Sequence, residues 1–332
     1  MHTFKDVLLK YRFKLNTENT IYNTMSNEEK FVVIRRSFTE SGLFSYFFTS
    51  LTQIRYALEM GFVPIIDLQT NYYTFLHEAD EVGRVNMWDR FFSQYHGYTL
   101  EDAVNAKSVT YIEDIGYNSK YPISFDNFLD LSDDIAVYKK IISTHVGLNS
   151  DTSEYVNEIF KRVIPKNSKV LGVNYRESYA RRIPKGHCIQ PDLTKVTHDI
   201  DSAISNAGFT HIYLATEDHA VIRHFQNVYG DKLLFVQRPR VNQYENFVKI
   251  DSDLEALLNS TNTNWGNNNK NIESINFNRP RDKFTKAREY ISEMYILSKC
   301  DGLIGPVTNG LAYAYLIKKT KYEFEKIYSD VY

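Results

Sequence analysis

Apolar residues in the first part of the chain follow two patterns, short continuous runs and one longer stretch with helical spacing. The run Phe31–Arg35 predicts a short strand. Between Phe44 and Met60, apolar residues recur at helical spacing, and Gly61 stands where a helix C-cap is expected. Phe62–Asp67 is a second short run, and it ends in an acid. This order predicts a strand–helix–strand unit, from which parallel sheets are built.

The second half of the chain repeats this alternation more regularly. Apolar runs that predict strands alternate with helical patterns in the order 169–175, 193–207, 211–216, 220–229 and 233–237. Such alternation is typical of an α/β fold with a doubly wound parallel sheet.

The pattern near the C-terminus combines a helix, a strand and a second helix. The first helix is predicted from Thr285 to Lys299, the strand lies in Cys300–Pro306, and the second helix covers Leu311–Ile317. Between strand and helix, Thr308 and Asn309 add hydroxyl and amide groups to the backbone N–H groups of a helix start. This turn can cradle a phosphate, and Thr308 can cap the helix at the same time.

Shorter elements and polar segments set the predicted domain organisation. The first half also contains a short aromatic helix, a strand and a mixed polar helix, at 86–93, 108–112 and 129–150. Polar residues cluster without periodicity at 149–153, and we place a domain boundary there. The predicted domains are 1–150 and 151–318, with a polar insertion at about 240–282, and the last segment, 319–332, is a tail or helix. Within the insertion, the low-complexity stretch Thr261–Asn271 predicts a mobile connection or lid.

Composition narrows the class of protein. The chain has 332 residues, of which 43% are hydrophobic, and its 39 basic and 41 acidic residues give a net charge of −2. This balance, without a basic block, argues against a nucleic-acid binder. Two cysteines, Cys188 and Cys300, are too few for a disulfide framework and favour a reducing compartment. The sequence shows no signal-peptide pattern and no run of the roughly 20 apolar residues that a membrane span needs. We therefore expect a cytoplasmic protein with at most peripheral membrane contact.

A basic loop follows the predicted strand at 169–175. It carries Arg176, Arg181, Arg182, Lys185 and His187. In open α/β sheets, ligands bind at the carboxyl ends of the strands, and this many positive groups suit an anion such as phosphate. The alternative is a solvated basic loop beside a core strand.

Acidic residues follow two other predicted elements. Glu217 and Asp218 come directly after the strand at 211–216, where they can accept hydrogen bonds from ribose hydroxyls or a base edge, and Asp218 can instead cap the next helix. Asp251 and Asp253 form an Asp-x-Asp pattern of the kind that holds a metal–nucleotide complex, but such a short pattern often arises by chance, and we favour a helix N-terminus as their role.

Several of these segments resemble the GDP-fucose-dependent fucosyltransferase superfamily, which includes α-1,2-, α-1,6- and protein-O-fucosyltransferases. Gly172–Arg176 resembles its Gly-Val-His-x-Arg segment, and Gly186–Pro191 is similar to the Gly-His-x-Ile-Gln-Pro of bacterial members. Leu214–Asp218 resembles Ala-Thr-Asp-Asp. Ile296–Ile304, followed by Thr308 and Asn309, is similar to Leu-Leu-Ser-x-Cys-Asp-x-Leu-Ile followed by Ser-Ser or Ser-Asn.

The resemblance implies a fold and a reaction. The fold is GT-B-like, with two Rossmann-like domains facing a cleft. The implied enzyme transfers fucose from GDP-fucose, a nucleotide sugar, to a glycan or glycoconjugate acceptor, with inversion and with neither a metal nor another cofactor. The first domain is the acceptor side, and the second binds the donor.

The resemblance also implies roles for individual residues. Arg176 would grip the donor diphosphate, and the other implied donor-binding residues are Asn174, Glu217, Asp218, Thr308, Asn309 and Gly42. The candidate catalytic bases, in order of preference, are His187, Glu177 and Glu293. Asn174 stands where the family usually has His, and Glu177–Tyr179 stands where many members have Thr-Asp.

These departures keep two alternatives open. The chain could use another nucleotide sugar on the same fold, or it could bind a nucleotide sugar or glycan without catalysis. The aromatic residues Tyr72, Tyr73 and Trp88 are expected in the core, and the alternative is that they line a groove for a sugar acceptor.

Overall fold

The structure is a computed structural model that describes residues 29–39, 41–73, 75–114, 118, 120–121, 132–176, 189–240 and 277–329. The chain divides into two compact units, and among the described residues the first ends at Glu154 and the second begins at Tyr155. The division falls inside helix α5 (Ser150–Val163), where the sequence predicted an irregular polar segment around 150. The polar cluster starts this helix, because the Asn149 side chain accepts a hydrogen bond from the Thr152 backbone N–H at 2.8 Å.

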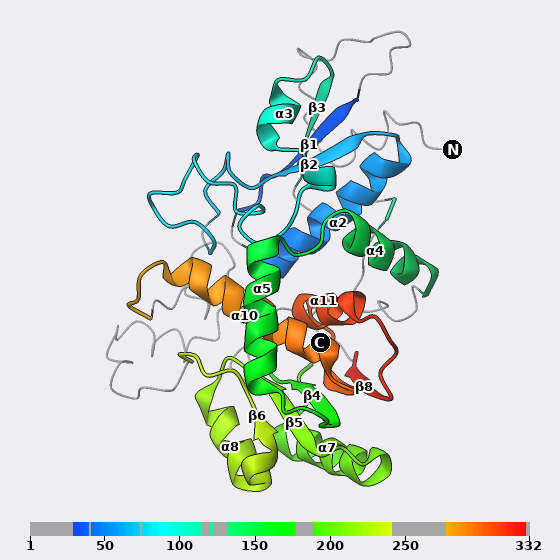
Figure 1. The fold of residues 1–332 in the computed structure, drawn as a ribbon, viewed down its shortest axis with the longest axis vertical. Coiled ribbons are helices and arrows are strands. Elements are labelled where there is room, and N and C mark those ends of the chain that lie inside the picture. The colour runs from blue at the N-terminus through cyan, green and yellow to red at the C-terminus, as the bar shows by residue number, and fades with distance from the viewer. Residues whose placement is uncertain are drawn as a thin grey trace. The chain divides into compact units, whose positions relative to one another are not determined.

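Unit 1 contains a three-stranded parallel sheet in the order β2-β1-β3. The elements of unit 1 that precede α5 are β1 (Phe31–Arg36), α2 (Leu43–Glu59), β2 (Val63–Asp67), the short helix η2 (Tyr95–Gly97), α3 (Leu100–Val104), β3 (Val109–Asp114) and α4 (Ser132–Thr144). Because strand side chains alternate, Phe31 and Val33 pack with Ala103 on one face of the sheet. Helix α2 packs against β1 and β2 (Figure 1).

The segment 86–93 is not the aromatic helix that the sequence predicted. Its Asn86 side chain is used by strand β2, since the amide oxygen accepts from Leu68 N–H at 3.0 Å and the amide nitrogen donates to Ile66 C=O at 2.7 Å. These contacts hold the following residues in turns. Trp88 is only 1% exposed and its ring stacks on that of Phe47, so the core interpretation of Trp88 is confirmed.

Unit 2 contains a five-stranded parallel sheet in the order β6-β5-β4-β7-β8. Its elements after α5 are β4 (Val170–Asn174), α7 (Leu193–Ala207), β5 (His211–Ala215), α8 (His219–Tyr229), the short helix η4 (Gly230–Lys232), β6 (Leu233–Leu234), α10 (Asp282–Lys299), β7 (Gly302–Pro306), α11 (Asn309–Ile317) and β8 (Phe324–Tyr328). This is the strand order of a Rossmann-like fold. The order reverses between β4 and β7, which is therefore the topological switch point.

Helices cover both faces of the unit 2 sheet (Figure 1). Leu171 and Val173 of β4 pack with α7 and α8 in one core cluster. Gly172, which points the opposite way, lies against α10, because a Cβ there would meet Leu297 and Cys300 at 2.9 and 3.2 Å. The predicted α/β architecture with Rossmann-like parallel sheets is confirmed for each unit.

The C-terminal segment differs from its prediction as a tail or helix. Phe324–Tyr328 forms β8, which pairs with β7 along its length. The buried Tyr328 ring joins the core, and its hydroxyl donates to Asp199 at 2.8 Å. Glu325 and Lys326, which are adjacent and both exposed, break the alternation that marks a strand in the sequence, so the strand follows from its pairing with β7.

Candidate functional site

The predicted donor-binding residues of unit 2 gather at the carboxyl edge of its sheet. Asn174 ends β4, Arg176 follows two residues later, and Thr308 follows β7, so these side chains border the switch point. The two strands approach closely there, because a Cβ on Gly305 would lie 3.0 Å from both the Cβ and the carbonyl oxygen of Asn174. The Asn174 amide nitrogen lies 3.5 Å from the Thr308 hydroxyl and links the two strand ends.

Arg176 is held at this edge by Glu217. Its Nη2 donates to both carboxylate oxygens, at 3.1 and 3.3 Å, and its backbone N–H donates to Gln190 Oε1 at 3.2 Å. The Arg176 and Glu217 side chains are 14% and 18% exposed, so the pair is shielded but can still be reached by solvent. A guanidinium in this setting can bind an anion without a large rearrangement.

The N-terminus of α11 forms the other side of the switch point. Thr308 caps the helix, since its hydroxyl accepts from Leu311 N–H at 3.2 Å, and no acidic side chain lies in the first turn. The first N–H groups of a helix have no intrahelical acceptor and carry partial positive charge. Within the described part of the chain, the buried Oδ1 of Asn309 also has no hydrogen-bond partner. This turn therefore offers donors for a phosphate and an acceptor for a ligand hydroxyl.

Asp218 acts as a helix cap in the structure. Its Oδ1 accepts from Ala220 N–H at 2.8 Å at the start of α8, and the residue is 5% exposed. The sequence left a cap and a ribose contact open for this residue, and the cap is the role that the geometry shows. Glu217, one residue earlier, points instead to Arg176.

A buried group of three charged side chains lies beside this edge, and sequence reasoning did not predict it. Glu293 of α10 accepts from Arg238 at 2.9 Å through both oxygens, and its Oε1 also accepts from Arg240 at 3.1 Å. The side chains of Arg238, Arg240 and Glu293 are 7%, 2% and 1% exposed. We call these three residues the Glu293 triad.

The triad argues against the predicted role of Glu293 as a general base. Both Glu293 oxygens accept hydrogen bonds from arginines and the side chain is 1% exposed, so an acceptor hydroxyl would have to displace an arginine to reach it. Burial alone would lower the pKa of Arg238, but the charge and hydrogen bonds of Glu293 outweigh it and raise that pKa. For Arg240, burial dominates and lowers the pKa, with partial compensation from Glu293.

The triad also shortens strand β6, which was predicted over 233–237 but covers only Leu233 and Leu234. Arg240 Nη2 donates to Val236 C=O at 2.7 Å, so the guanidinium takes a carbonyl that a longer strand would offer to a neighbour. An Arg-Pro-Arg sequence directly after an apolar run was the available signal for this arrangement.

Other predicted site residues lie elsewhere. Gly42 belongs to unit 1, where it precedes α2 in an extended conformation (φ −73°, ψ 161°) that any residue adopts, so its backbone gives no special reason for glycine. The candidate bases Glu177 and His187 lie outside the described residues, as do Asp251, Asp253 and the stretch 261–271. Their roles stay predictions.

Across the described ranges, no three or more His, Cys, Asp or Glu side chains are grouped so that they could hold a metal ion. None of the helices in the described part of the chain has the length and hydrophobicity to cross a membrane.

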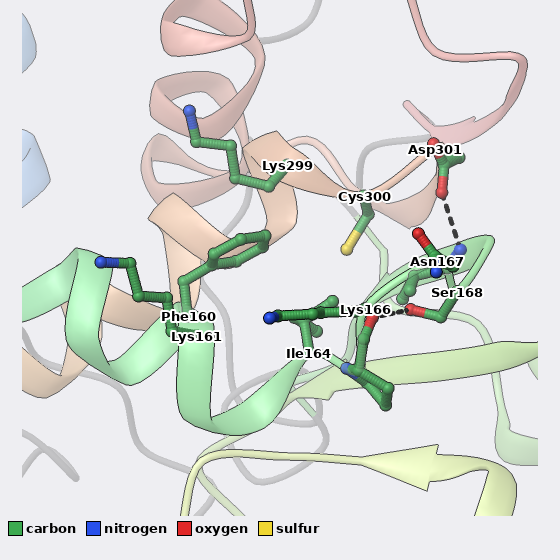
Figure 2. A pocket seen from close by; sticks show the side chains of 11 residues that line it. Phe160, Lys161, Ile164, Lys166, Asn167, Ser168, Lys299, Cys300 and Asp301 are labelled. Atoms are coloured by element: carbon green, nitrogen blue, oxygen red, sulfur yellow. Dashed lines mark hydrogen bonds between the residues drawn. The ribbon is translucent and has the colours of Figure 1, made fainter.

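A pocket of about 290 Å³ lies at the opposite edge of the unit 2 sheet (Figure 2). The end of α5, the turn before β4 and the junction of α10 with β7 line it. Burial raises the pKa of the Cys300 thiol, which donates to Ile296 C=O, and Asp301 accepts from Val170 N–H at 2.8 Å. These groups serve the fold, and the pocket lies at the amino ends of the strands, away from the residues described above.

The three aromatic residues considered for a sugar-binding groove differ in exposure. Tyr73 and Trp88 are buried, at 0% and 1% exposed, so both are core residues. Tyr72 is 44% exposed, and Phe38, which follows the neighbouring strand β1, is 41% exposed. The Asn71 side chain donates to Arg36 C=O at 2.9 Å and thereby ties together the two loops that carry Phe38 and Tyr72.

No protein-family model matches the sequence, and the search of curated proteins found no match. Among solved structures, the chain is similar to NodZ α-1,6-fucosyltransferase soaked with GDP-fucose (13% identity, TM-score 0.46, 87% of this chain and 93% of that one). It is also similar to fucosyltransferase NodZ from Bradyrhizobium (12%, 0.45, 87% and 94%) and to the apo form of POFUT1 (8%, 0.47, 92% and 99%). Because these TM-scores are below 0.5, we base the function on residues of this chain.

Proposed function

We propose that the protein is a glycosyltransferase that binds the diphosphate of a nucleotide sugar at the carboxyl edge of the unit 2 sheet. The observation that carries the proposal is the placement of Arg176 and the Thr308-capped start of α11 on the two sides of the switch point. Ligands of open α/β sheets bind at this point. The motif resemblance identifies the donor as GDP-fucose.

Leaving-group stabilisation follows from this arrangement. When the bond between sugar and diphosphate breaks, negative charge develops on the β-phosphate. The Arg176 guanidinium and the N–H groups at the start of α11 are positioned donors that can stabilise this charge without a metal ion. Asn309, with its unpaired buried carbonyl within the described residues, can accept from a hydroxyl of the ligand.

The acceptor in this proposal is a glycan or glycoconjugate. Its hydroxyl needs a general base, for which His187 and Glu177 are the remaining candidates. The exposed Phe38 and Tyr72 of unit 1 support a sugar acceptor, because aromatic faces pack against the apolar face of a pyranose ring.

The first test is a thermal-shift panel in EDTA with GDP, UDP, CDP, ADP and dTDP. A ligand that binds only the folded state at about 100 times its Kd adds about 2.7 kcal/mol to the free energy of unfolding. Selective stabilisation by GDP supports the GDP-fucose donor and leads to transfer assays with glycan acceptors. Selective stabilisation by another nucleoside diphosphate would assign a different donor sugar nucleotide. Stabilisation by a diphosphate without any turnover favours a binding protein. A shift that appears only when manganese replaces EDTA contradicts the metal-free mechanism.

A further inference from the structure

We infer that the Glu293 triad positions Arg176, through the Thr216 carbonyl and Glu217, and so sets the affinity of the diphosphate site. This inference rests on the proposed function for its effect on ligand binding. The hydrogen bonds and ion pairs that connect the triad to Arg176 all join described residues.

The first link joins the triad to the turn after β5. The Thr216 carbonyl oxygen accepts two hydrogen bonds from the triad, at 3.3 Å from Arg238 Nη2 and at 3.0 Å from Arg240 Nε. Both guanidinium groups are themselves oriented by Glu293. Charged donors make stronger hydrogen bonds than neutral ones, and they are strongest where water is excluded.

The second link fixes Glu217 from both sides. Thr216, the preceding residue, is held by the triad, and its hydroxyl accepts from Asp218 N–H at 3.3 Å. Asp218, the following residue, caps α8. With both neighbours fixed, the Glu217 backbone has little freedom, and its carboxylate can hold the Arg176 guanidinium at one place beside the switch point.

The arrangement of charges favours a positioning role over a purely stabilising one. A buried ion group is often no more stabilising than apolar residues of the same volume, because both charges must lose their hydration.

The decisive variant is Glu293→Gln, and the chain offers a matched control. Glu289 lies one turn earlier on α10, is also buried, and pairs with Arg279 through two hydrogen bonds of 2.7 Å. The Arg279 hydrogen bonds reach Asp282 and Glu289 rather than Thr216. Glu289→Gln therefore breaks a similar ion pair on the same helix and removes no hydrogen bond of the pathway, although the Glu289 charge also acts on Arg238 and Arg240. Arg238→Lys is a milder second variant, since it keeps the charge but loses the two-pronged contact.

The measurement that needs no ligand is the side-chain Nε–H signal of Arg176 in ¹⁵N-arginine-labelled full-length protein, assigned by its loss in Arg176→Lys. We expect Glu293→Gln and Arg238→Lys to shift this signal and to speed its exchange with water, while Glu289→Gln leaves it in place. An unchanged Arg176 signal in the folded triad variants overturns the inference. If Glu293→Gln does not fold, Arg238→Lys decides.

The second measurement is the Kd of GDP by titration calorimetry. A displacement of about 1 Å can reduce the effectiveness of a positioned group about 100-fold, so we expect a 10-fold to 100-fold rise in Kd for Glu293→Gln and less than a 3-fold rise for Glu289→Gln. In a Glu217→Gln background, the further effect of Glu293→Gln should fall to about 2-fold, because the connection is already broken. If Glu293→Gln raises the Kd of GDP by the same factor in the wild type and in the Glu217→Gln background, that result contradicts the pathway. If the wild type does not bind GDP, the donor proposal fails. The positioning role is then tested only by the Nε–H signal of Arg176.

Discussion

Each unit has an arginine at or beyond the carboxyl end of its central parallel strand, but the two arginines are placed differently. In unit 1, Arg35 lies inside the central strand β1 and pairs with Asp67 at 2.8 Å and Glu113 at 3.1 Å, which are its register partners on the two neighbouring strands. In unit 2, Arg176 lies two residues beyond its strand and pairs with Glu217, which lies two residues beyond the next. The Arg35 ion pairs join neighbouring strands, whereas the Arg176–Glu217 pair joins two loops at the edge of the sheet.

The acidic partners show the same difference. The Asp67 carboxylate is 0% exposed and accepts from Arg35, from the N–H groups of Gln69 and Thr70, and from the Thr70 hydroxyl. Four hydrogen bonds, one of them from Arg35, thus fix this carboxylate beside Arg35. Glu217 is 18% exposed, and an incoming diphosphate can compete for Arg176 directly. On the proposed function, the arginine within the ladder holds strands together, whereas the arginine beyond the ladder binds the ligand.

The largest expected effect is on Arg176→Ala. Loss of a charge-assisted contact to the diphosphate should reduce kcat/KM for GDP-fucose at least 100-fold, since removing one preorganised donor typically reduces kcat by a factor of 100 to 1,000. The melting temperature should change little, because the pair is partly exposed. Initial rates of GDP release test this. Activity within 3-fold of wild type would remove Arg176 from the mechanism.

Asp67→Asn should instead act on stability. Burial opposes ionisation of Asp67, but hydrogen bonds from Thr70 and Gln69 and the charge of Arg35 hold the pKa of its carboxyl below the usual 3.8. The resulting stabilisation is present above about pH 4 and is lost as the pH falls through the lowered folded-state pKa. We expect the variant to lose about 2 kcal/mol at neutral pH and to show a flatter acid-unfolding profile.

Denaturant titrations from pH 2 to 7 measure this loss, with Glu113→Gln as the control. Glu113 also pairs with Arg35 but is 39% exposed, so its loss should be below about 1 kcal/mol. Equal losses of unfolding free energy for the two variants would contradict the structural role of the buried Arg35–Asp67 pair in unit 1.

Thr308→Ala should show a mixed effect. Loss of the cap of α11 removes about 1 kcal/mol of stability, and loss of the hydroxyl beside the diphosphate should raise the Kd of GDP about 10-fold. Thr308→Ser should retain both. Thr99→Ala, which removes the cap of α3 in unit 1, should reduce stability by a similar amount without changing the Kd. The idea that Thr308 both caps and binds fails if its alanine variant behaves like Thr99→Ala.

The smallest effect is expected for Tyr72→Ala. Loss of one aromatic face from a sugar site is worth about 1 kcal/mol, which corresponds to about a 5-fold rise in the acceptor KM at unchanged donor KM. Val82→Ala, another exposed apolar side chain of unit 1, serves as the control. Equal acceptor kinetics for the two variants would move the acceptor away from Tyr72.

Local patterns predicted much of the fold. The helix at 193–207 and the strand at 211–215 were predicted within a residue of their observed ends, because Asp192 and Gly208 are strong caps and the strand is a continuous apolar run. Elsewhere, contacts between residues far apart in the sequence determine the structure, and the local pattern does not predict them. The Asn86 side chain binds the β2 backbone and prevents a helix, and edge strand β8 depends on pairing with β7.

The candidate site was predictable in part. The sequence predicted that Arg176 and Thr308 each follow a strand, whereas the pairing of those two strands, β4 with β7, comes from the structure. The Glu293 triad was not predictable, since Arg238 and Glu293 are 55 residues apart and meet only in the folded unit. The sequence signal at Glu293 was a motif match, which identified the position but not its two arginine partners.

The most direct test of the central claim is a pair of matched substitutions, Arg176→Lys and Arg35→Lys, in GDP titration calorimetry with EDTA present. Each keeps the positive charge and removes the planar guanidinium. We predict that Arg176→Lys raises the Kd of GDP at least 10-fold and that Arg35→Lys leaves it within 2-fold of wild type. Unchanged affinity in Arg176→Lys, or an equal loss in Arg35→Lys, would contradict a diphosphate site at the carboxyl edge of the unit 2 sheet.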